Sequence, residues 1–455
     1  MSTVTRPVHQ PERVRPTRRQ ARNAFAVLSI INILNYADRS VLSAVLPKIQ
    51  HDFVLNNTEL GVLASSFLII YALTTLPLGI WADRGVRKNI VALCVAIWSV
   101  ATTLVGLTSN FLQLLGLRTV LGIGEAGYAP ASLSLIGDYF SKTHRARVLS
   151  FWSIGNLIGT ALGLVLGGII ADRFGWRWAF YIVGLPGLIT AFLIWRATEP
   201  KRGAFEEEET QGELTDESAS TVTVSEHGSL SGDFWLAAQR LFHIPTYWIL
   251  LGAFIFSFFT IGSASVWIPS FIHEAFHLSV ARSSIISGGV LAGGSLVGTL
   301  LGGWLADTLQ HRLPQGRMIV STFALLVGAP ITLIALSIHT IVPFVVVFIV
   351  AIICLSLCLG PLNAIIQDVI APQVRATAIG LILLLAHLFG DAASPIIVGA
   401  IADSYNAIYH SQQGLGFALL ITSPICLALA GFICLLGIRT VAQDMRRMQQ
   451  SLQKQ

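Results

Sequence analysis

Charged side chains stand inside long apolar runs at two places in the chain. One run contains RTVLGIGEAGYAP, which begins at Arg118, and an earlier run contains NYADRSVL, with Asp38 and Arg39. Arg118 and Glu125 are two helical turns apart, so both fall on one helix face. A charge at membrane depth costs roughly 2.5–3.5 kcal/mol on insertion scales and is usually paired or facing water. We therefore expect the two sets of charges to face one central cavity.

These four side chains suit chemistry in which a proton is taken up and released. Desolvation and a neighbouring arginine shift the pKa of a carboxylate in opposite directions, and their competition can bring it into the titratable range. Protonation of Asp38 or Glu125 would then release Arg118 to reorganise the cavity, with Arg39 as the second cation. The alternative is a permanent ion pair with a structural role.

A third stretch, AHLFGDAASP, places His387 four residues before Asp391. Residues at this spacing lie on one helix face and can interact. The alternative for His387 is a packed, hydrogen-bonded core residue. We expect the pair to line the same cavity, together with Tyr36 and Tyr128 from the first two stretches.

The composition indicates which elements must position these groups. Of the 455 residues, 54% are hydrophobic and 12% are charged, whereas a soluble domain averages about 25% charged residues. We therefore expect an all-α protein that crosses the membrane many times. The five cysteines lie in apolar runs and are interpreted as core residues, not as a disulfide framework or a metal site.

Apolar runs of about 20 residues predict transmembrane helices. Twelve such runs cover residues 24–46, 59–81, 90–108, 112–137, 147–170, 177–196, 246–271, 284–305, 318–338, 342–366, 375–400 and 415–438. The predicted parts are a basic N-terminus (1–23), a six-helix half (24–196), a linker (197–245), a second six-helix half (246–438) and a tail (439–455). The Glu/Ser/Thr-rich tract 201–230 predicts disorder, and DFWLAAQRLFH at 233–243 predicts an amphipathic surface helix.

The positive charges predict an orientation. Most of the 29 lysines and arginines lie in alternate connections, starting with the N-terminus, while Lys48, Arg173, Arg177 and Arg282 lie on the other side. Lys and Arg are enriched in cytoplasmic loops, so both termini and the linker are predicted to be cytoplasmic, in a multi-pass plasma-membrane protein. The same asymmetry explains the net charge of +5 without a nucleic-acid partner.

One phrase recurs at the ends of the second, fifth, eighth and eleventh runs. It reads LGIWADRGVRK at 78–88, LGGIIADRFGWR at 166–177, LGGWLADTLQHR at 301–312 and VGAIADSYN at 398–406. The repeating unit is therefore three helices, used four times. Because three is odd, successive copies are inverted, and two inverted pairs joined by a loop is the plan of the major facilitator fold.

The first copy of the phrase also matches the loop motif of that superfamily, which we interpret as a conformational gate. Its residues are Gly79, Asp83, Arg84, Arg87 and Lys88, with Asp307 as the later counterpart. An aspartate at a helix end with basic neighbours can latch adjacent helices in one conformation. The alternative is ordinary anchoring charge on the cytoplasmic side.

Glycines recur at every fourth position on two of the predicted helices. They are Gly155, Gly159, Gly163 and Gly167 on one, and Gly294, Gly298 and Gly302 on the other. Small residues at this spacing let helix backbones approach closely. We interpret them as smooth seams on which the two halves rock against each other; the alternative is static packing.

Two signatures typical of enzymes are interpreted as coincidences. The pattern G-x-G-x-x-G at 122–127 lies in the middle of a predicted span with no strand before it. The pattern H-E-x-x-H at 273–277 lacks a third zinc ligand nearby. No phosphate-binding loop occurs. We therefore expect no enzyme activity, no metal and no cofactor, with a proton gradient as the energy source.

At these residues the chain resembles the Spinster family of the major facilitator superfamily. The resemblance covers residues 24–438 and rests on NYADRSVL, DRGVRK, RTVLGIGEAGYAP and above all AHLFGDAASPIIVGAIAD. It implies a twelve-helix transporter of lysophospholipids or sphingosine-phosphate-like lipids. It also implies that Asp38 and Glu125 respond to protons, and that Arg39 and Arg118 are their partners or contact the lipid headgroup.

We therefore predict a monomeric, proton-coupled secondary transporter in a bacterial inner membrane, working by alternating access. Its substrate is an amphipathic lipid or a related organic anion, because a phosphate headgroup suits arginine. The first alternative is an organic-anion or drug transporter of the same superfamily. A different class, membrane receptor or intramembrane protease, is the remaining alternative.

Overall fold

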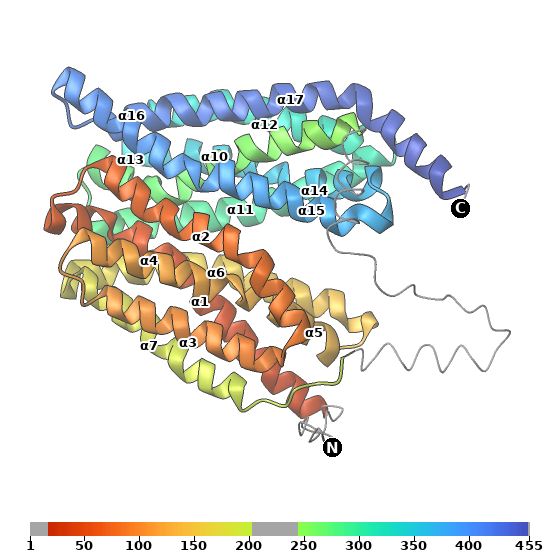
Figure 1. The fold of residues 1–455 in the computed structure, drawn as a ribbon. Coiled ribbons are helices and arrows are strands. Elements are labelled where there is room, and N and C mark those ends of the chain that lie inside the picture. The colour runs from red at the N-terminus through yellow and green to blue at the C-terminus, as the bar shows by residue number, and fades with distance from the viewer. Residues whose placement is uncertain (1–16, 203–243, 454–455) are drawn as a thin grey trace, which may run out of the picture.

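The computed structural model describes residues 17–202 and 244–453. The amphipathic helix expected at 233–243, most of the linker and most of the basic N-terminus lie outside these residues. Within them the structure is entirely helical. The helices form two groups that lie side by side, residues up to 202 in red to yellow and residues from 244 in green to blue (Figure 1). We call these groups the N-half and the C-half.

The N-half contains seven helices. They are α1 (Arg18–Phe53), α2 (Asn57–Arg84), α3 (Arg87–Val105), α4 (Phe111–Ala126), α5 (Tyr128–Tyr139), α6 (Lys142–Phe174) and α7 (Trp176–Trp195). The fourth predicted span is divided at Gly127 into α4 and α5. The other five spans of this half each correspond to one helix that is long and apolar enough to cross a membrane.

The C-half repeats this plan. Its helices are α10 (Pro245–Ala275), α11 (Val280–Gln310), α12 (Gly316–Leu336), α13 (Ile341–Leu357), α14 (Leu359–Val369), α15 (Pro372–Ala386), the π-helix η1 (His387–Asp391), α16 (Ala393–Tyr409) and α17 (Gly414–Gln453). The tenth span is divided at Cys358, as the fourth is at Gly127, while the eleventh runs through η1. The prediction of twelve spans in two six-helix halves is confirmed.

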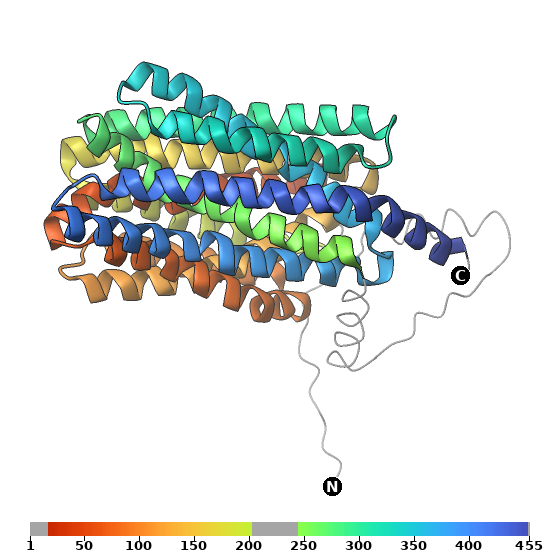
Figure 2. The ribbon, with the colours of Figure 1, turned by 90° about the horizontal axis from the view of Figure 1, so that it is seen from above.

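The long helices run side by side, as two views related by 90° show (Figures 1 and 2). We call the end of the bundle that holds the α1–α2 and α16–α17 connections the distal end. The opposite, terminal end is where α1 begins and α17 finishes. At the distal end α2 starts at Asn57, because the side chains of Asn56 and Glu59 accept hydrogen bonds from each other's backbone N–H groups.

The apolar core joins the two halves toward the distal end. One cluster of buried residues includes Val45 and Leu164 of the N-half together with Trp267 and Val280 of the C-half. A second cluster, built around residues such as Tyr128, belongs to the N-half alone. The halves are therefore packed against each other at one end and have separate cores toward the other.

The glycine stripes do not lie where the sequence interpretation placed them. A methyl group at Gly163 would lie 2.7 Å from the Cα of Ala37 in α1, and one at Gly298 would lie 3.0 Å from the Cα of Ile353 in α13. Both stripes therefore join helices of the same half, α1 to α6 and α11 to α13. The interpretation as seams between moving halves was wrong, because each stripe faces its own half and serves static packing.

The last helix, α17, forms hydrogen bonds with the first helix of the C-half, α10. Helix α17 continues to Gln453, past the predicted end of its span. There the carboxylate of Asp444 accepts hydrogen bonds from the backbone N and the Oγ1 of Thr246, at 3.1 Å and 2.7 Å. Thr246 lies in the first turn of α10, so Asp444 caps that helix.

Candidate functional site

The central ion pair of the N-half joins α1 to α4. Nε of Arg39 donates a hydrogen bond to Oε2 of Glu125 at 2.6 Å. The Glu125 side chain is fully buried, whereas 22% of the Arg39 side chain is exposed. Sequence spacing suggested Arg118 as the group released from the carboxylate, but the direct contact is made by Arg39. The pair therefore has one accessible member, the cation.

Asp38, the residue directly before Arg39 in α1, is buried in the same region. Its Oδ2 accepts a hydrogen bond from Oγ1 of Thr102 in α3 at 2.5 Å, and its Oδ1 has no partner among the described residues. Asp38 also interacts electrostatically with Glu125, Arg118 and Arg39. The two carboxylates and two guanidinium groups thus form one cluster.

Arg118 is the buried cation of this cluster, with 2% of its surface exposed. Its guanidinium carbon lies 5.0 Å from the centre of the Phe67 ring. Its Nε and Nη1 have no hydrogen-bond partner among the described residues. Because a buried guanidinium normally has all its donors bonded, the N–H groups on these two nitrogens can donate to a polar ligand.

Aromatic rings surround the guanidinium of Arg39. Its central carbon lies 4.5 Å from the ring centre of Tyr71, and 5.2 Å from those of Tyr36 and Phe67. Cations at such distances are attracted by the ring faces. Tyr36, predicted from sequence, is therefore part of the site, while Tyr71 and Phe67 were missed because aromatic residues in apolar runs have no distinctive spacing.

The C-half contributes His387 and Asp391, which lie at the two ends of the π-helix η1. Nδ1 of His387 is 2.7 Å from Oδ2 of Asp391, and the imidazole meets the ring of Phe258 edge to face at 4.9 Å. A π-turn inside a helix is often found at functional sites. Asp391 interacts electrostatically with Arg39 of the other half. The pair therefore faces the N-half cluster.

Tyr128 lies elsewhere. It is 2% exposed, its hydroxyl donates a hydrogen bond to the backbone oxygen of Leu28 at 3.2 Å, and its ring lies beside Trp98 and Trp152. This is the interior of the N-half, not the boundary between the halves. The prediction that Tyr128 lines the cavity is therefore not supported by its position, because it follows the helix break at Gly127 and points into the core.

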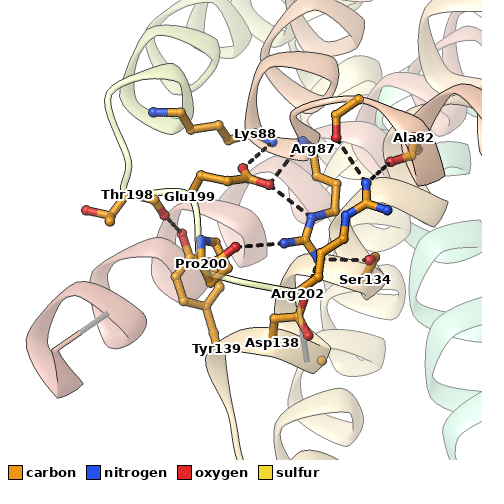
Figure 3. A network of polar contacts seen from close by, with 12 residues as sticks. Ala82, Arg87, Lys88, Ser134, Asp138, Tyr139, Thr198, Glu199, Pro200 and Arg202 are labelled. Atoms are coloured by element: carbon orange, nitrogen blue, oxygen red, sulfur yellow. Dashed lines mark hydrogen bonds and ion pairs between the residues drawn. The ribbon is translucent and has the colours of Figure 1, made fainter. Parts of the chain in front are cut away.

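The predicted gating motif is the centre of a polar network at the terminal end (Figure 3). Arg87 is buried, and its guanidinium donates to Glu199 at 3.0 Å, to Ser134 at 3.1 Å, to the backbone oxygen of Pro200 at 3.0 Å, and to Asp138. This network fixes the segment after α7 against α3 and α5. The three carboxylate and hydroxyl partners were missed by the sequence analysis, because each lies far from Arg87 in the chain.

The rest of the motif is less enclosed. The Lys88 ammonium donates to the backbone oxygen of Ala197 at 2.7 Å, whereas Arg84 is exposed and Gly79 borders Pro130 of α5. The side chain of Asp83 is outside the described part of the structure. In the C-half, Arg317 bridges Asp307 and Asp368, at 2.9 Å and 2.5 Å. Asp307 thus bonds within its own half.

The enzyme-like patterns have structural explanations. Gly122 and Gly124 lie inside helix α4, where added methyl groups would collide with the backbones of α2 and α3. Nδ1 of His273 is 2.6 Å from the backbone oxygen of Leu278. Across residues 17–202 and 244–453 no three His, Cys, Asp or Glu side chains are grouped as a metal site would need. Neither pattern has the structural context that its chemistry requires.

Comparison with known proteins agrees with the fold. Residues 28–395 match the family model described as "Major Facilitator Superfamily". "Protein spinster homolog 3" of Danio rerio is 30% identical over 94% of this chain and 85% of that protein. "Sphingosine-1-phosphate transporter SPNS2" of Danio rerio is 28% identical over 90% and 83%. A crystal structure of a bacterial homologue of human Spinster, inward-facing and unoccupied, has a TM-score of 0.77 at 24% identity, over 96% of this chain and 99% of that one.

Proposed function

Since the chain belongs to the Spinster type of the major facilitator superfamily of transporters, we propose that it carries an amphipathic lipid or a related organic anion across the membrane, driven by a proton gradient. The transporter class excludes an enzyme. The observation that carries the proposal is the contact between Arg39 and Glu125, in which a buried carboxylate holds a partly exposed cation.

This contact supports proton coupling through competition for Arg39. Removing one partner of a buried ion pair costs about 3–5 kcal/mol, because the other charge is left uncompensated. Protonation of Glu125 removes its charge and frees Arg39 for an anionic headgroup or for Asp391. Arg39, which is released from Glu125, then transmits the effect of protonation to the C-half. The residue spacing had instead suggested Arg118 for this role.

Several features support an amphipathic anionic substrate. The guanidinium groups of Arg39 and Arg118 suit a phosphate or carboxylate, which can accept two parallel hydrogen bonds. Phe258 lies beside His387 at the boundary and offers an apolar contact, whereas Phe254 and Phe259 are buried in the C-half core. The similarity to a protein named for sphingosine-1-phosphate transport points to the same class of substrate.

The expected arrangement in the membrane follows from the charge asymmetry of the loops. We place the terminal end of the bundle in the cytoplasm, with both termini and the linker, in a bacterial inner membrane. Residues 24–196 and 246–438 are then the two bodies that rock against each other in a monomer. The separate cores of the halves toward the terminal end support an inward-facing state of this cycle.

The test is transport by the purified protein in liposomes under an imposed pH gradient. A labelled lysophospholipid, a sugar acid and a cationic drug are supplied in separate assays. We expect gradient-dependent movement of the lysophospholipid. Movement of the sugar acid or the drug instead would identify an organic-anion or drug transporter of the same fold. Transport at the same rate with and without the pH gradient would refute proton coupling.

A further inference from the structure

Asp403, near the end of α16, reaches across to the other half of the protein. Its Oδ1 accepts hydrogen bonds from the backbone N and side-chain Nδ2 of Asn57, at 3.0 Å and 2.9 Å. Its Oδ2 accepts from the backbone N and Oγ1 of Thr58, at 2.7 Å and 2.6 Å. Asn57 and Thr58 form the first turn of α2, where backbone N–H groups have no partner within the helix. A C-half carboxylate therefore caps an N-half helix.

Asp172 makes the reverse contact. It lies near the end of α6 in the N-half, and its Oδ2 accepts a hydrogen bond from the backbone N of Ala281 at 2.8 Å. Ala281 is in the first turn of α11 in the C-half. The ammonium of Lys48 lies 3.5 Å from the other oxygen of Asp172. An N-half carboxylate therefore caps a C-half helix, at the same end of the bundle.

Glycines allow both contacts by letting the helix backbones approach. A methyl group at Gly399, one turn before Asp403, would lie 2.7 Å from the backbone carbon of Asn57. A methyl group at Gly168, one turn before Asp172, would lie 2.6 Å from Cβ of Ser284. In both helices the glycine and the aspartate are four residues apart, on the same face. The two contacts are thus in equivalent positions of the two six-helix halves.

We propose that Asp172 and Asp403 are gate residues, which hold the distal end of the transport path closed by capping the first turn of a helix in the opposite half. They are the second and fourth of the repeated aspartates. Five hydrogen bonds between described residues cross the boundary through them. Because three of these five bonds use backbone N–H donors that the start of a helix always offers, the gate opens by separation of the halves without local unfolding.

The test measures the distance between the halves at the distal end. Spin labels are attached at Leu112→Cys in the N-half and Ile408→Cys in the C-half, two exposed positions, in a protein whose native cysteines have been replaced. Asp403→Asn loses the charge and turns an amide donor toward backbone N–H groups. We expect the open fraction, seen as longer distances, to rise about tenfold, as for the loss of a good helix cap.

The matched control is Asp52→Asn. Asp52 is also a hydrogen-bonded carboxylate at the distal end, but its partners, Trp176 and Arg177, belong to its own half. We expect no change in the distance distribution for this variant. Equal distributions for Asp403→Asn and Asp52→Asn would overturn the proposal.

Two further variants keep the proposal testable if Asp403→Asn does not fold. Thr58→Val removes a single donor to Asp403 and is expected to shift the distances in the same direction by a smaller amount. Asp172→Asn keeps an oxygen for the N–H of Ala281, so it is also expected to lengthen the distances by a smaller amount than Asp403→Asn. The absence of a shift in both would count against the gate. No substrate is needed, so the result is independent of the proposed proton coupling.

Discussion

Thr102 and Asp38 share a hydrogen bond of 2.5 Å between two buried side chains on different helices. The hydroxyl is the only hydrogen-bond donor that Asp38 meets among the described residues. Thr102 therefore sets the direction in which the second carboxylate oxygen points. The sequence analysis identified Asp38, but it did not identify Thr102, on which the orientation of Asp38 depends.

Replacing Thr102 by valine should therefore destabilise the protein. The substitution keeps the shape of the side chain but leaves both oxygens of Asp38 without a partner, which costs about 1–3 kcal/mol. We expect a lower Tm in detergent and an altered pH profile of transport. Thr102→Ser retains the hydroxyl and should restore both. A valine variant with an unchanged pH profile would show that the hydroxyl has no part in coupling.

The coupling assignment predicts a specific loss in Glu125→Gln and Asp38→Asn. Each change keeps the shape of the side chain and removes its ability to exchange a proton. We expect both variants to bind substrate while their transport no longer responds to pH, as measured by binding and by liposome uptake with and without a gradient. Glu59→Gln, which preserves the helix cap, is the control. Wild-type pH dependence in both variants would remove these carboxylates from the mechanism.

The network around Arg87 makes a prediction about stability. Arg87→Ala removes a buried guanidinium from Glu199, Asp138, Ser134 and Pro200, so the loss should approach the cost of about 3–5 kcal/mol for a broken buried ion pair. Thermal unfolding of the purified protein measures it. Arg84→Ala at an exposed position should stay within about 0.5 kcal/mol of the wild type. Similar effects of the two changes would mean that the network adds little to stability.

The glycine stripes predict opposite effects for two similar substitutions. A methyl group at Gly163 meets the backbone of α1, so Gly163→Ala should destabilise the protein by about 1–3 kcal/mol through overpacking. Gly293 has nothing within 4 Å of its added carbon. There alanine should be neutral or stabilising by up to about 1 kcal/mol, because glycine is a poor helix former. Tm values for the two variants, measured side by side, decide whether the stripe is a tight contact.

Much of the fold could be predicted because membrane insertion is encoded locally. Runs of about 20 apolar residues identify the helices, and the recurring aspartate phrase gives the repeat. The same reasoning identified Asp38, Arg39 and Glu125, because charges in an apolar run stand out. It could not choose the partner of Glu125. Arg118 is on the same helix face as Glu125, but Arg39 reaches the carboxylate from another helix. The rotation of one helix relative to another depends on tertiary packing and cannot be inferred from the sequence of either helix.

The role of small residues could not be predicted for the same reason. A stripe such as Gly155 to Gly167 indicates close packing but not the identity of the helix that it meets. The repeated aspartates were recognised, yet Asp172 and Asp403 contact the opposite half, whereas Asp307 bonds within its own. Their chain positions are equivalent. The difference arises from the state of the whole bundle, in which one end is closed.

The bond between Asp444 and Thr246 has a consequence for how the C-half is made. Ribosomes deliver the first turn of α10 long before they reach the tail, so this turn lacks its partner throughout synthesis of almost two hundred residues. Chains truncated before Asp444 would therefore insert α10 without the cap on its first turn. We expect membrane proteases to degrade such chains faster than the full chain.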